Sequence, residues 1–191
     1  ADSLHYMSVE GLVRSIGLPK EDLCLGCLTG VYPTKKINDY VQQRKREARK
    51  DFNIAVLASG RGSNLQSIID AVERKSLDVS LAVVVCDRKD ALALQRAKKH
   101  GIDAVFVDPL QFSDKDAYEA KVLEVLKSHN VDLVVLAGYM KIVGRTLLDA
   151  FPEAVINIHP TLLPKFKGCM ALDCHEQVIN AGEKETGCTV H

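Results

Sequence analysis

From residue 53 onward, short apolar runs alternate with segments of helical periodicity, and this alternation constrains the fold more than any other feature. The apolar runs predict strands at residues 53–58, 79–86, 104–107, 132–137 and 155–158, and a last strand begins at residue 188. Helical spacing recurs at residues 65–72, 91–100, 115–129, 144–151 and 172–181. Strands that are apolar throughout indicate a sheet covered on both faces, and intervening helices give right-handed βαβ units. The sequence therefore predicts an α/β fold with three layers and a mostly parallel, Rossmann-like sheet.

The first predicted strand runs into a loop with two glycines, Gly60 and Gly62. Glycine allows a tight turn and lets the backbone approach a ligand closely. Ser63 and Asn64 then begin a helix, and a helix N-terminus attracts anions through its N–H groups and its dipole. We therefore expect this loop to bind a phosphate group, and a turn with a purely structural role is the alternative.

A dinucleotide is the competing ligand for the same loop. Gly60 and Gly62 begin the dinucleotide fingerprint, and Asp87 follows the second predicted strand at a suitable distance for a ribose contact. However, Leu65 stands where that fingerprint has its third glycine. The pattern therefore favours a monophosphate over a dinucleotide.

A second polar feature lies at the end of the strand predicted at residues 155–158. Asn157 and His159 are two residues apart, and Pro160 ends the run. Side chains two apart in a strand point to the same face, and open α/β sheets bind ligands at the carboxyl ends of their strands. An amide and an imidazole there can polarise a carbonyl and move a proton. A lone histidine near a strand end is more often a structural hydrogen-bonding group, so this pair alone does not decide the function.

The charge and the cysteine content bear on the class of protein. Lys plus Arg equals Asp plus Glu, 25 each, and this zero net charge argues against a nucleic-acid partner. No apolar run approaches the ~20 residues of a membrane span, and the first residues do not read as a signal peptide. The six cysteines form no dense framework, and Cys86 and Cys188 are predicted to be buried free thiols. We therefore expect a cytoplasmic protein.

Three motifs together resemble the phosphoribosylglycinamide formyltransferase family. They lie at residues 58–64, 136–142 and 156–165, and the resemblance covers roughly residues 52–191. It implies the formyltransferase fold and transfer of a formyl group from 10-formyltetrahydrofolate, the co-substrate, to the amine of phosphoribosylglycinamide in purine biosynthesis. It also implies small-molecule substrates, no metal and no membrane partner, and a homodimer is one candidate assembly.

The resemblance assigns roles to individual residues. Gly62, Ser63 and Asn64 match the loop for the substrate phosphate, and Asn157 and His159 match the catalytic amide and imidazole. The residues that match the folate-binding segment are Met140, Lys141, Ile142 and Val143, with Arg96 as a weaker candidate.

The residues after His159 favour this family over related ones. Another folate-dependent formyltransferase, a formyltetrahydrofolate deformylase and a phosphate-binding remnant without catalysis are the alternatives. The chain departs from the family's pattern at Lys167, where proline is common, and at residues 169–174. His159, His175 and His191 have no obvious partners for a zinc site. The family continues beyond the equivalent of His191 into a loop with a catalytic aspartate, so we expect these 191 residues alone to have little or no transferase activity.

Residues 1–37 resemble the C-terminal end of a different enzyme of the same pathway, amidophosphoribosyltransferase. Cys24 and Cys27 would match two of the four iron–sulfur ligands of that family, and two thiolates cannot complete a [4Fe–4S] site, so we expect no stable cluster. Residues 38–51 are predicted to be a basic linker. A true fusion and an artefact of gene prediction or read-through explain this junction equally well. The expected organisation is an irregular or helical appendage at residues 1–37 followed by an incomplete formyltransferase domain at residues 52–191.

Overall fold

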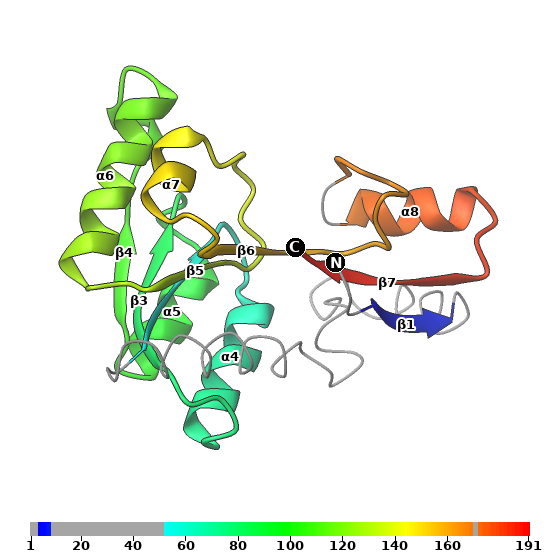
Figure 1. The fold of residues 1–191 in the computed structure, drawn as a ribbon, viewed down its shortest axis with the longest axis horizontal. Helices are drawn as coiled ribbons and strands as arrows, with labels where there is room; N and C mark the ends of the chain where they lie inside the picture. Colours follow the sequence, from blue (N-terminus) through cyan, green and yellow to red (C-terminus); the bar gives the residue numbers. More distant parts are fainter. Residues whose placement is uncertain (1–3, 9–51, 170–171) are drawn as a thin grey trace. The chain divides into compact units, whose positions relative to one another are not determined.

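The computed structural model describes residues 4–8, 52–169 and 172–191. The chain divides into two compact units, which are taken one at a time below. The larger unit is Thr34–Ile156, and the smaller unit combines Ala1–Pro33 with Asn157–His191. Figure 1 shows the helices and strands with the labels used here.

The larger unit is built on four parallel strands that pair in the order β5-β2-β3-β4. These strands are β2 (Asn53–Ala58), β3 (Ser80–Cys86), β4 (Asp103–Phe106) and β5 (Leu133–Leu136). Val56 of β2 lies opposite Val84 of β3 on one side and Val135 of β5 on the other. All three valines are 0% exposed, as expected for a parallel sheet covered on both faces. The predicted parallel α/β sheet is confirmed for this unit.

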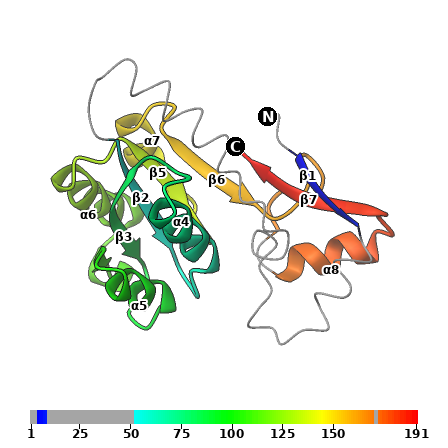
Figure 2. The ribbon, with the colours of Figure 1, turned by 90° about the horizontal axis from the view of Figure 1, so that it is seen from below.

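Helices cover both faces of this sheet (Figure 2). They are α4 (Ser63–Glu73), α5 (Leu92–Lys99), α6 (Lys115–Ser128) and α7 (Arg145–Ala150), with a short 3₁₀ helix, η1 (Pro109–Gln111). The chain moves from β2 to β3 to β4 in one direction and then returns to β5. Right-handed crossovers therefore place α4 and α5 on one face, and α6 and α7 on the other. The expected three layers follow directly from this order of strands.

The start of a helix and its buried face are set by residues close together in the sequence, as α4 and α6 illustrate. In α4, Leu65, Ile68 and Ile69 recur at helical spacing and are at most 2% exposed. The Asp114 side chain caps α6 by accepting a hydrogen bond from the Ala117 N–H at 2.8 Å. These signals are short-range, which explains why the predicted helices agree with the observed ones to within a few residues.

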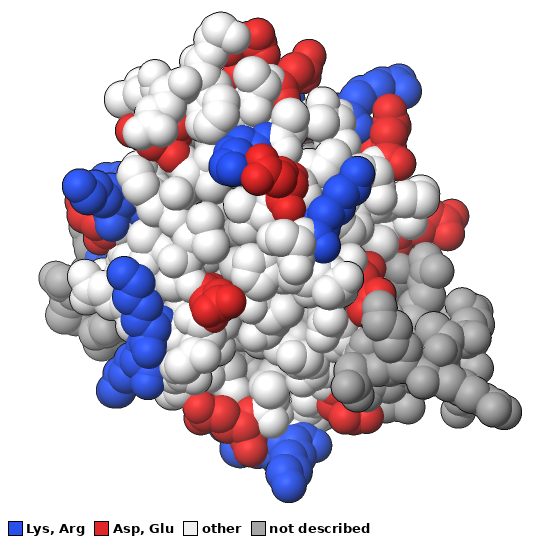
Figure 3. Space-filling model, turned by 90° about the vertical axis from the view of Figure 1, so that its left-hand side faces the viewer, with Lys and Arg blue, Asp and Glu red and all other residues white. Residues whose placement is uncertain are grey.

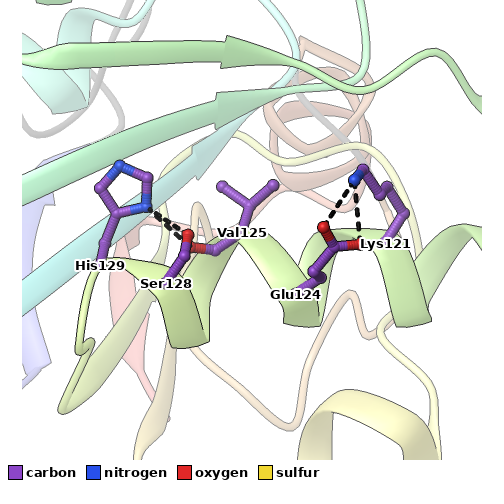
Figure 4. A network of polar contacts seen from close by, with 5 residues as sticks. All are labelled: Lys121, Glu124, Val125, Ser128 and His129. Carbon is purple, nitrogen blue, oxygen red and sulfur yellow. Dashed lines mark hydrogen bonds and ion pairs between the residues drawn. The ribbon is translucent and has the colours of Figure 1, made fainter.

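The C-terminal turn of α6 is closed by side chains (Figure 4). The Val125 carbonyl accepts hydrogen bonds from Ser128 Oγ at 2.8 Å and from His129 Nδ1 at 2.7 Å. His129 Nε2 also lies 3.2 Å from the Asp103 carboxylate at the start of β4. His129 is thus a structural histidine that joins a helix end to a strand.

Charged side chains of both signs are interspersed on the face drawn in Figure 3, and neither sign gathers into a large patch there. This distribution agrees with the zero net charge of the chain. None of the described helices combines the length and the hydropathy that a bilayer span requires.

Among its described residues, the smaller unit contains antiparallel strand pairs and the helix α8 (Leu172–Asn180). From Asn157 on, β6 (Val155–His159) belongs to this unit and pairs with β7 (Glu185–Val190), which in turn pairs with β1 (Leu4–Ser8). The last predicted strand begins at residue 185, three residues earlier than expected.

The expectation of an irregular or helical appendage at residues 1–37 was wrong for Leu4–Ser8, which form a strand. Pairing with β7 satisfies backbone groups that an edge strand would otherwise expose, and a local sequence pattern does not reveal such a partner. The other residues of that appendage, Cys24 and Cys27 among them, and the predicted linker at residues 38–51 lie outside the described residues.

Candidate functional site

The glycine loop joins the carboxyl end of β2 to the first turn of α4, as predicted. Gly62 is the N-cap of α4 and has a φ of 69°, in the left-handed region. A Cβ at this position would lie 2.8 Å from both Cα and Cβ of Ala93, in the first turn of α5. The Ala93 N–H donates to the Gly60 carbonyl at 3.1 Å. Glycine is therefore needed at position 62 both for the backbone conformation and for the close approach of α5.

Ser59 connects this loop to the turn that follows β5. Its side chain is 3% exposed, and its Oγ accepts a hydrogen bond from the Met140 N–H at 2.8 Å. Its own N–H donates to the Gly138 carbonyl at 3.0 Å. Because β2 and β5 are parallel neighbours, both turns lie at the same edge of the sheet. The structure thus brings the predicted phosphate loop and the predicted folate segment together.

The predicted folate segment presents apolar side chains to solvent. Met140 is 44% exposed and Ile142 is 76% exposed, although both are large and hydrophobic, and Val143 is half-buried. Lys141 Nζ lies 5.5 Å from the centre of the Tyr118 ring, within range of a cation–π contact. Exposed apolar groups beside a polar loop are typical of a site for a ligand with both kinds of surface.

Arg96 lies on α5 and contacts the glycine loop. Its Nε donates to the Arg61 carbonyl at 2.9 Å, and its Nη1 donates to Gln66 Oε1 at 3.0 Å. Arg96 therefore holds the loop in place, and its proposed contact with folate stays a prediction.

Asn157 and His159 lie on β6 in the smaller unit, and both side chains contact His191. Asn157 Nδ2 is 2.9 Å from His191 Nε2, and the rings of His159 and His191 are 6.5 Å apart at 69°. Backbone hydrogen bonds between Asn157 and His191 in both directions, at 2.7 and 3.0 Å, hold the two residues in register. His159 Nε2 is 3.3 Å from the Phe166 carbonyl, in the turn that follows.

Electrostatics favours a neutral His191. Burial lowers the pKa of His191 below its ordinary value, and the neighbouring His159 lowers it further by a smaller amount. A neutral imidazole offers one ring nitrogen as an acceptor, so His191 Nε2 can accept a hydrogen bond from the Asn157 amide. The amide is thereby oriented with its second hydrogen still available.

Comparison with known proteins shows the family to which this chain belongs. A family model described as formyl transferase matches residues 52–191. The chain is 42% identical over 137 residues to phosphoribosylglycinamide formyltransferase of Bacillus subtilis, covering 72% of this chain and 69% of that protein. The chain belongs to the formyl transferase family.

Two further relatives agree with this assignment. The crystal structure of glycinamide ribonucleotide transformylase 1 from Symbiobacterium toebii superposes with a TM-score of 0.71 and 44% identity, covering 74% of this chain and 65% of that one. The trifunctional purine biosynthetic protein adenosine-3 of Drosophila melanogaster is 33% identical to this chain. The match covers 96% of this chain and 14% of the Drosophila protein. The Bacillus and Symbiobacterium relatives are named as enzymes of this one formyl-transfer reaction, and the Drosophila relative as a purine biosynthetic protein. The expected formyltransferase fold is confirmed.

Within this formyl transferase fold, two tyrosines that the sequence did not indicate as site residues lie beside the predicted folate segment. Tyr118 Oη and Tyr139 Oη are 2.9 Å apart, beside the predicted folate segment. Burial raises the pKa of Tyr118 to about 12 and also raises the pKa of Tyr139, so both stay protonated at neutral pH. Tyr118 falls within the helical segment predicted at residues 115–129, and nothing in the sequence connects it to Tyr139, 21 residues away.

A pair of cysteines beside His159 was also missed. Cys169 and Cys174 form a disulfide in the structure, and Cys169 Sγ lies 3.8 Å from His159 Nε2. The departure of residues 169–174 from the family pattern was the available signal. Cys86 is a buried free thiol, as predicted, and Cys188 is also buried.

Proposed function

We propose that this chain carries the formyl-transfer chemistry of a phosphoribosylglycinamide formyltransferase. The observation that carries the proposal is the double hydrogen bonding of Ser59, which joins the glycine loop to an exposed apolar segment. A phosphate group and a folate ring system need these two surfaces. The matched relatives bear the names of enzymes with this activity, although the chain covers 65–69% of the single-function relatives described above.

In the proposed reaction, the substrate amine attacks the formyl carbon of 10-formyltetrahydrofolate. A carbon–nitrogen bond forms to the amine, the bond from the formyl carbon to the folate nitrogen breaks, and a proton passes from the amine to that leaving nitrogen. The formyl oxygen carries negative charge in between. No step of this scheme requires a metal.

Asn157 and His159 are proposed to act on that oxygen and that proton. The Asn157 amide has two hydrogens, and His191 holds one of them, so the other is free to donate to the oxyanion in a defined direction. His159, when protonated, would stabilise the same charge and relay a proton to the leaving nitrogen. Gly62, Ser63 and Asn64 are proposed to bind the substrate phosphate, and Met140 to Val143 the folate.

Calorimetry on a matched pair of variants tests the phosphate site. Asn64→Asp adds a negative charge to the proposed phosphate loop, and we expect it to weaken glycinamide ribonucleotide binding at least tenfold, about 1.4 kcal/mol. Asn130→Asp makes the same change at an exposed residue at the opposite edge of the sheet, where the Asn130 carbonyl accepts from Asn53. It should leave the affinity unchanged, and neither variant should alter binding of a folate analogue.

Equal ribonucleotide affinities in the two variants would contradict the phosphate assignment. Binding of the folate analogue without the ribonucleotide would favour another folate-dependent formyltransferase, and binding of the ribonucleotide alone would favour a non-catalytic remnant. Relative to the unsubstituted chain, Asn157→Ala and His159→Asn should each lower the rate of formyl transfer about 10²-fold or more, with both ligands still bound.

The cellular setting belongs to the same proposal. We place the protein in the cytoplasm, where its substrates would be made and its thiols kept reduced. Assembly as a homodimer stays a prediction, which sedimentation velocity would test.

A further inference from the structure

Three potential metal ligands from the smaller unit converge beside the end of β6. The nitrogen of His159 and the sulfurs of Cys169 and Cys174 all lie within 4.8 Å of one another. His159 is the last residue of β6, Cys169 lies in the following turn, and Cys174 lies on α8. Three separate segments of the chain therefore supply one cluster.

We propose that His159, Cys169 and Cys174 bind one soft divalent cation, Zn²⁺ above all, when the Cys169–Cys174 disulfide is reduced. Thiolate and imidazole are the ligands that zinc prefers in proteins, and cysteines with two to four residues between them are typical of zinc sites. Cys169 and Cys174 have four residues between them. His159 thus has two potential zinc partners that the sequence alone did not indicate.

The distances fit a single tetrahedral ion. With Zn–S near 2.3 Å and Zn–N near 2.0 Å, two ligands at the tetrahedral angle lie roughly 3.5 Å apart. The observed separation of Cys169 Sγ and His159 Nε2 is 3.8 Å. Only the two sulfurs must move, from bonding distance to roughly 3.8 Å, the separation that two thiolates have on one zinc.

The disulfide and the metal are alternative states of the same two sulfurs. A dithiol reductant would supply two electrons to the sulfur–sulfur bond and become a disulfide itself, leaving a protonated thiol on each cysteine. Metal binding would then release the two thiol protons to solvent. In a reducing compartment the thiol state predominates, so the proposed site would be the form available there.

The cluster has the character of an open site. Cys174 is buried, whereas His159 and Cys169 are each partly exposed, so an ion can enter from solvent. Among the residues that the structure describes, no fourth His, Cys, Asp or Glu joins the three. Three protein ligands leave one coordination position for water or another small ligand.

Metal binding would remove His159 from proton transfer. The ion would take the Nε2 that now lies 3.3 Å from the Phe166 carbonyl, so this imidazole could no longer be protonated there. The prediction that zinc inhibits formyl transfer therefore rests on the proposed function. The prediction that His159, Cys169 and Cys174 bind a metal ion does not. For that reason the test below measures binding and not activity.

Cobalt spectroscopy on the full chain provides the test. Cys24→Ser and Cys27→Ser are introduced as background, because that Cys-x-x-Cys pair could bind metal independently. After reduction, Co²⁺ is titrated and the thiolate-to-cobalt charge-transfer band is recorded. We expect one equivalent to bind, Zn²⁺ to displace it, and the same chain oxidised with diamide to give no band.

Substitutions assign the ligands. Cys169→Ser and Cys174→Ser should each weaken binding about 100-fold or more, and His159→Gln at least tenfold. Cys86→Ala, at the buried free thiol of the larger unit, should leave the titration unchanged. Circular dichroism of each variant confirms that it is folded. A reduced chain without the band, or a band that survives both Cys169→Ser and Cys174→Ser, would overturn the proposal.

Discussion

Gly62→Ala is expected to destabilise the larger unit strongly, although it adds only a methyl group. Residue 62 has a φ of +69°, and an alanine in the left-handed region costs roughly 1–2 kcal/mol. The new Cβ would also lie 2.8 Å from Cα and Cβ of Ala93, and overpacking of this kind typically costs about 1–3 kcal/mol. The stiffer unfolded chain offsets about 0.4–1 kcal/mol of this penalty. We therefore expect a net loss of about 1–5 kcal/mol in the free energy of unfolding, with the middle of these ranges at about 3 kcal/mol.

Gly60→Ala is the matched control, two residues away in the same loop. A Cβ at Gly60 meets nothing within 4 Å, and Gly60 is not among the glycines with positive φ. Its stability should therefore change by less than about 1 kcal/mol. The chain has no tryptophan, so urea unfolding is followed by far-UV circular dichroism.

With a urea m-value of about 2 kcal/mol/M, the middle of the usual range, a loss of about 3 kcal/mol shifts the midpoint of Gly62→Ala downward by roughly 1.5 M. Adding Ala93→Gly to Gly62→Ala should recover only part of the loss, because the Ala93 Cα remains as close as its Cβ. If Gly62→Ala and Gly60→Ala unfold at the same urea concentration, the steric account of this loop is wrong.

Three further outcomes can be measured on the same chain. Arg96→Met removes both hydrogen bonds from the Arg96 guanidinium to the loop region. Urea unfolding should show a loss of about 1–3 kcal/mol in the free energy of unfolding. An unchanged urea midpoint would show that those bonds contribute nothing. Burial lowers the pKa of His175 below 6.5, so as the pH falls the unfolded chain binds a proton at this residue before the folded chain does. The free energy of unfolding should therefore keep its full value above pH 6.5 and decrease as the pH drops below it. Thermal midpoints should accordingly be lower at pH 5 than at pH 7.5, and His175→Gln should narrow that difference. Burial, with a smaller contribution from Asp87, raises the pKa of the Cys86 thiol to about 12, so iodoacetamide at pH 8 should label Cys86 in urea and not in the native chain, as peptide mass analysis would show.

Local patterns in the sequence were sufficient for the described strands and α-helices of the larger unit, but not for the short 3₁₀ helix η1. β2 matches its predicted bounds because residues 54–58, after Asn53, are continuously apolar. α6 is set by the Asp114 cap and by the spacing of Tyr118, Val122 and Leu126. The pairing of β1 with β7 was not predictable in this way, because the partner strands are almost the whole chain apart. Strand pairing of that kind depends on which edge is left unpaired after the rest of the sheet has formed.

For the candidate site, the sequence by itself determined the family and the residue types: a glycine loop, the predicted folate segment at residues 140–143, and an amide and imidazole two residues apart. It could do so because these motifs are contiguous, and the chemistry of each follows from a few neighbouring residues. Only the tertiary structure decided which distant groups meet. Ser59 reaches Met140, Tyr118 reaches Tyr139, and Cys169 and Cys174 lie beside His159. Such contacts depend on strand order and on the path of each turn, which are settled by packing of the whole chain and leave no periodic trace in the sequence.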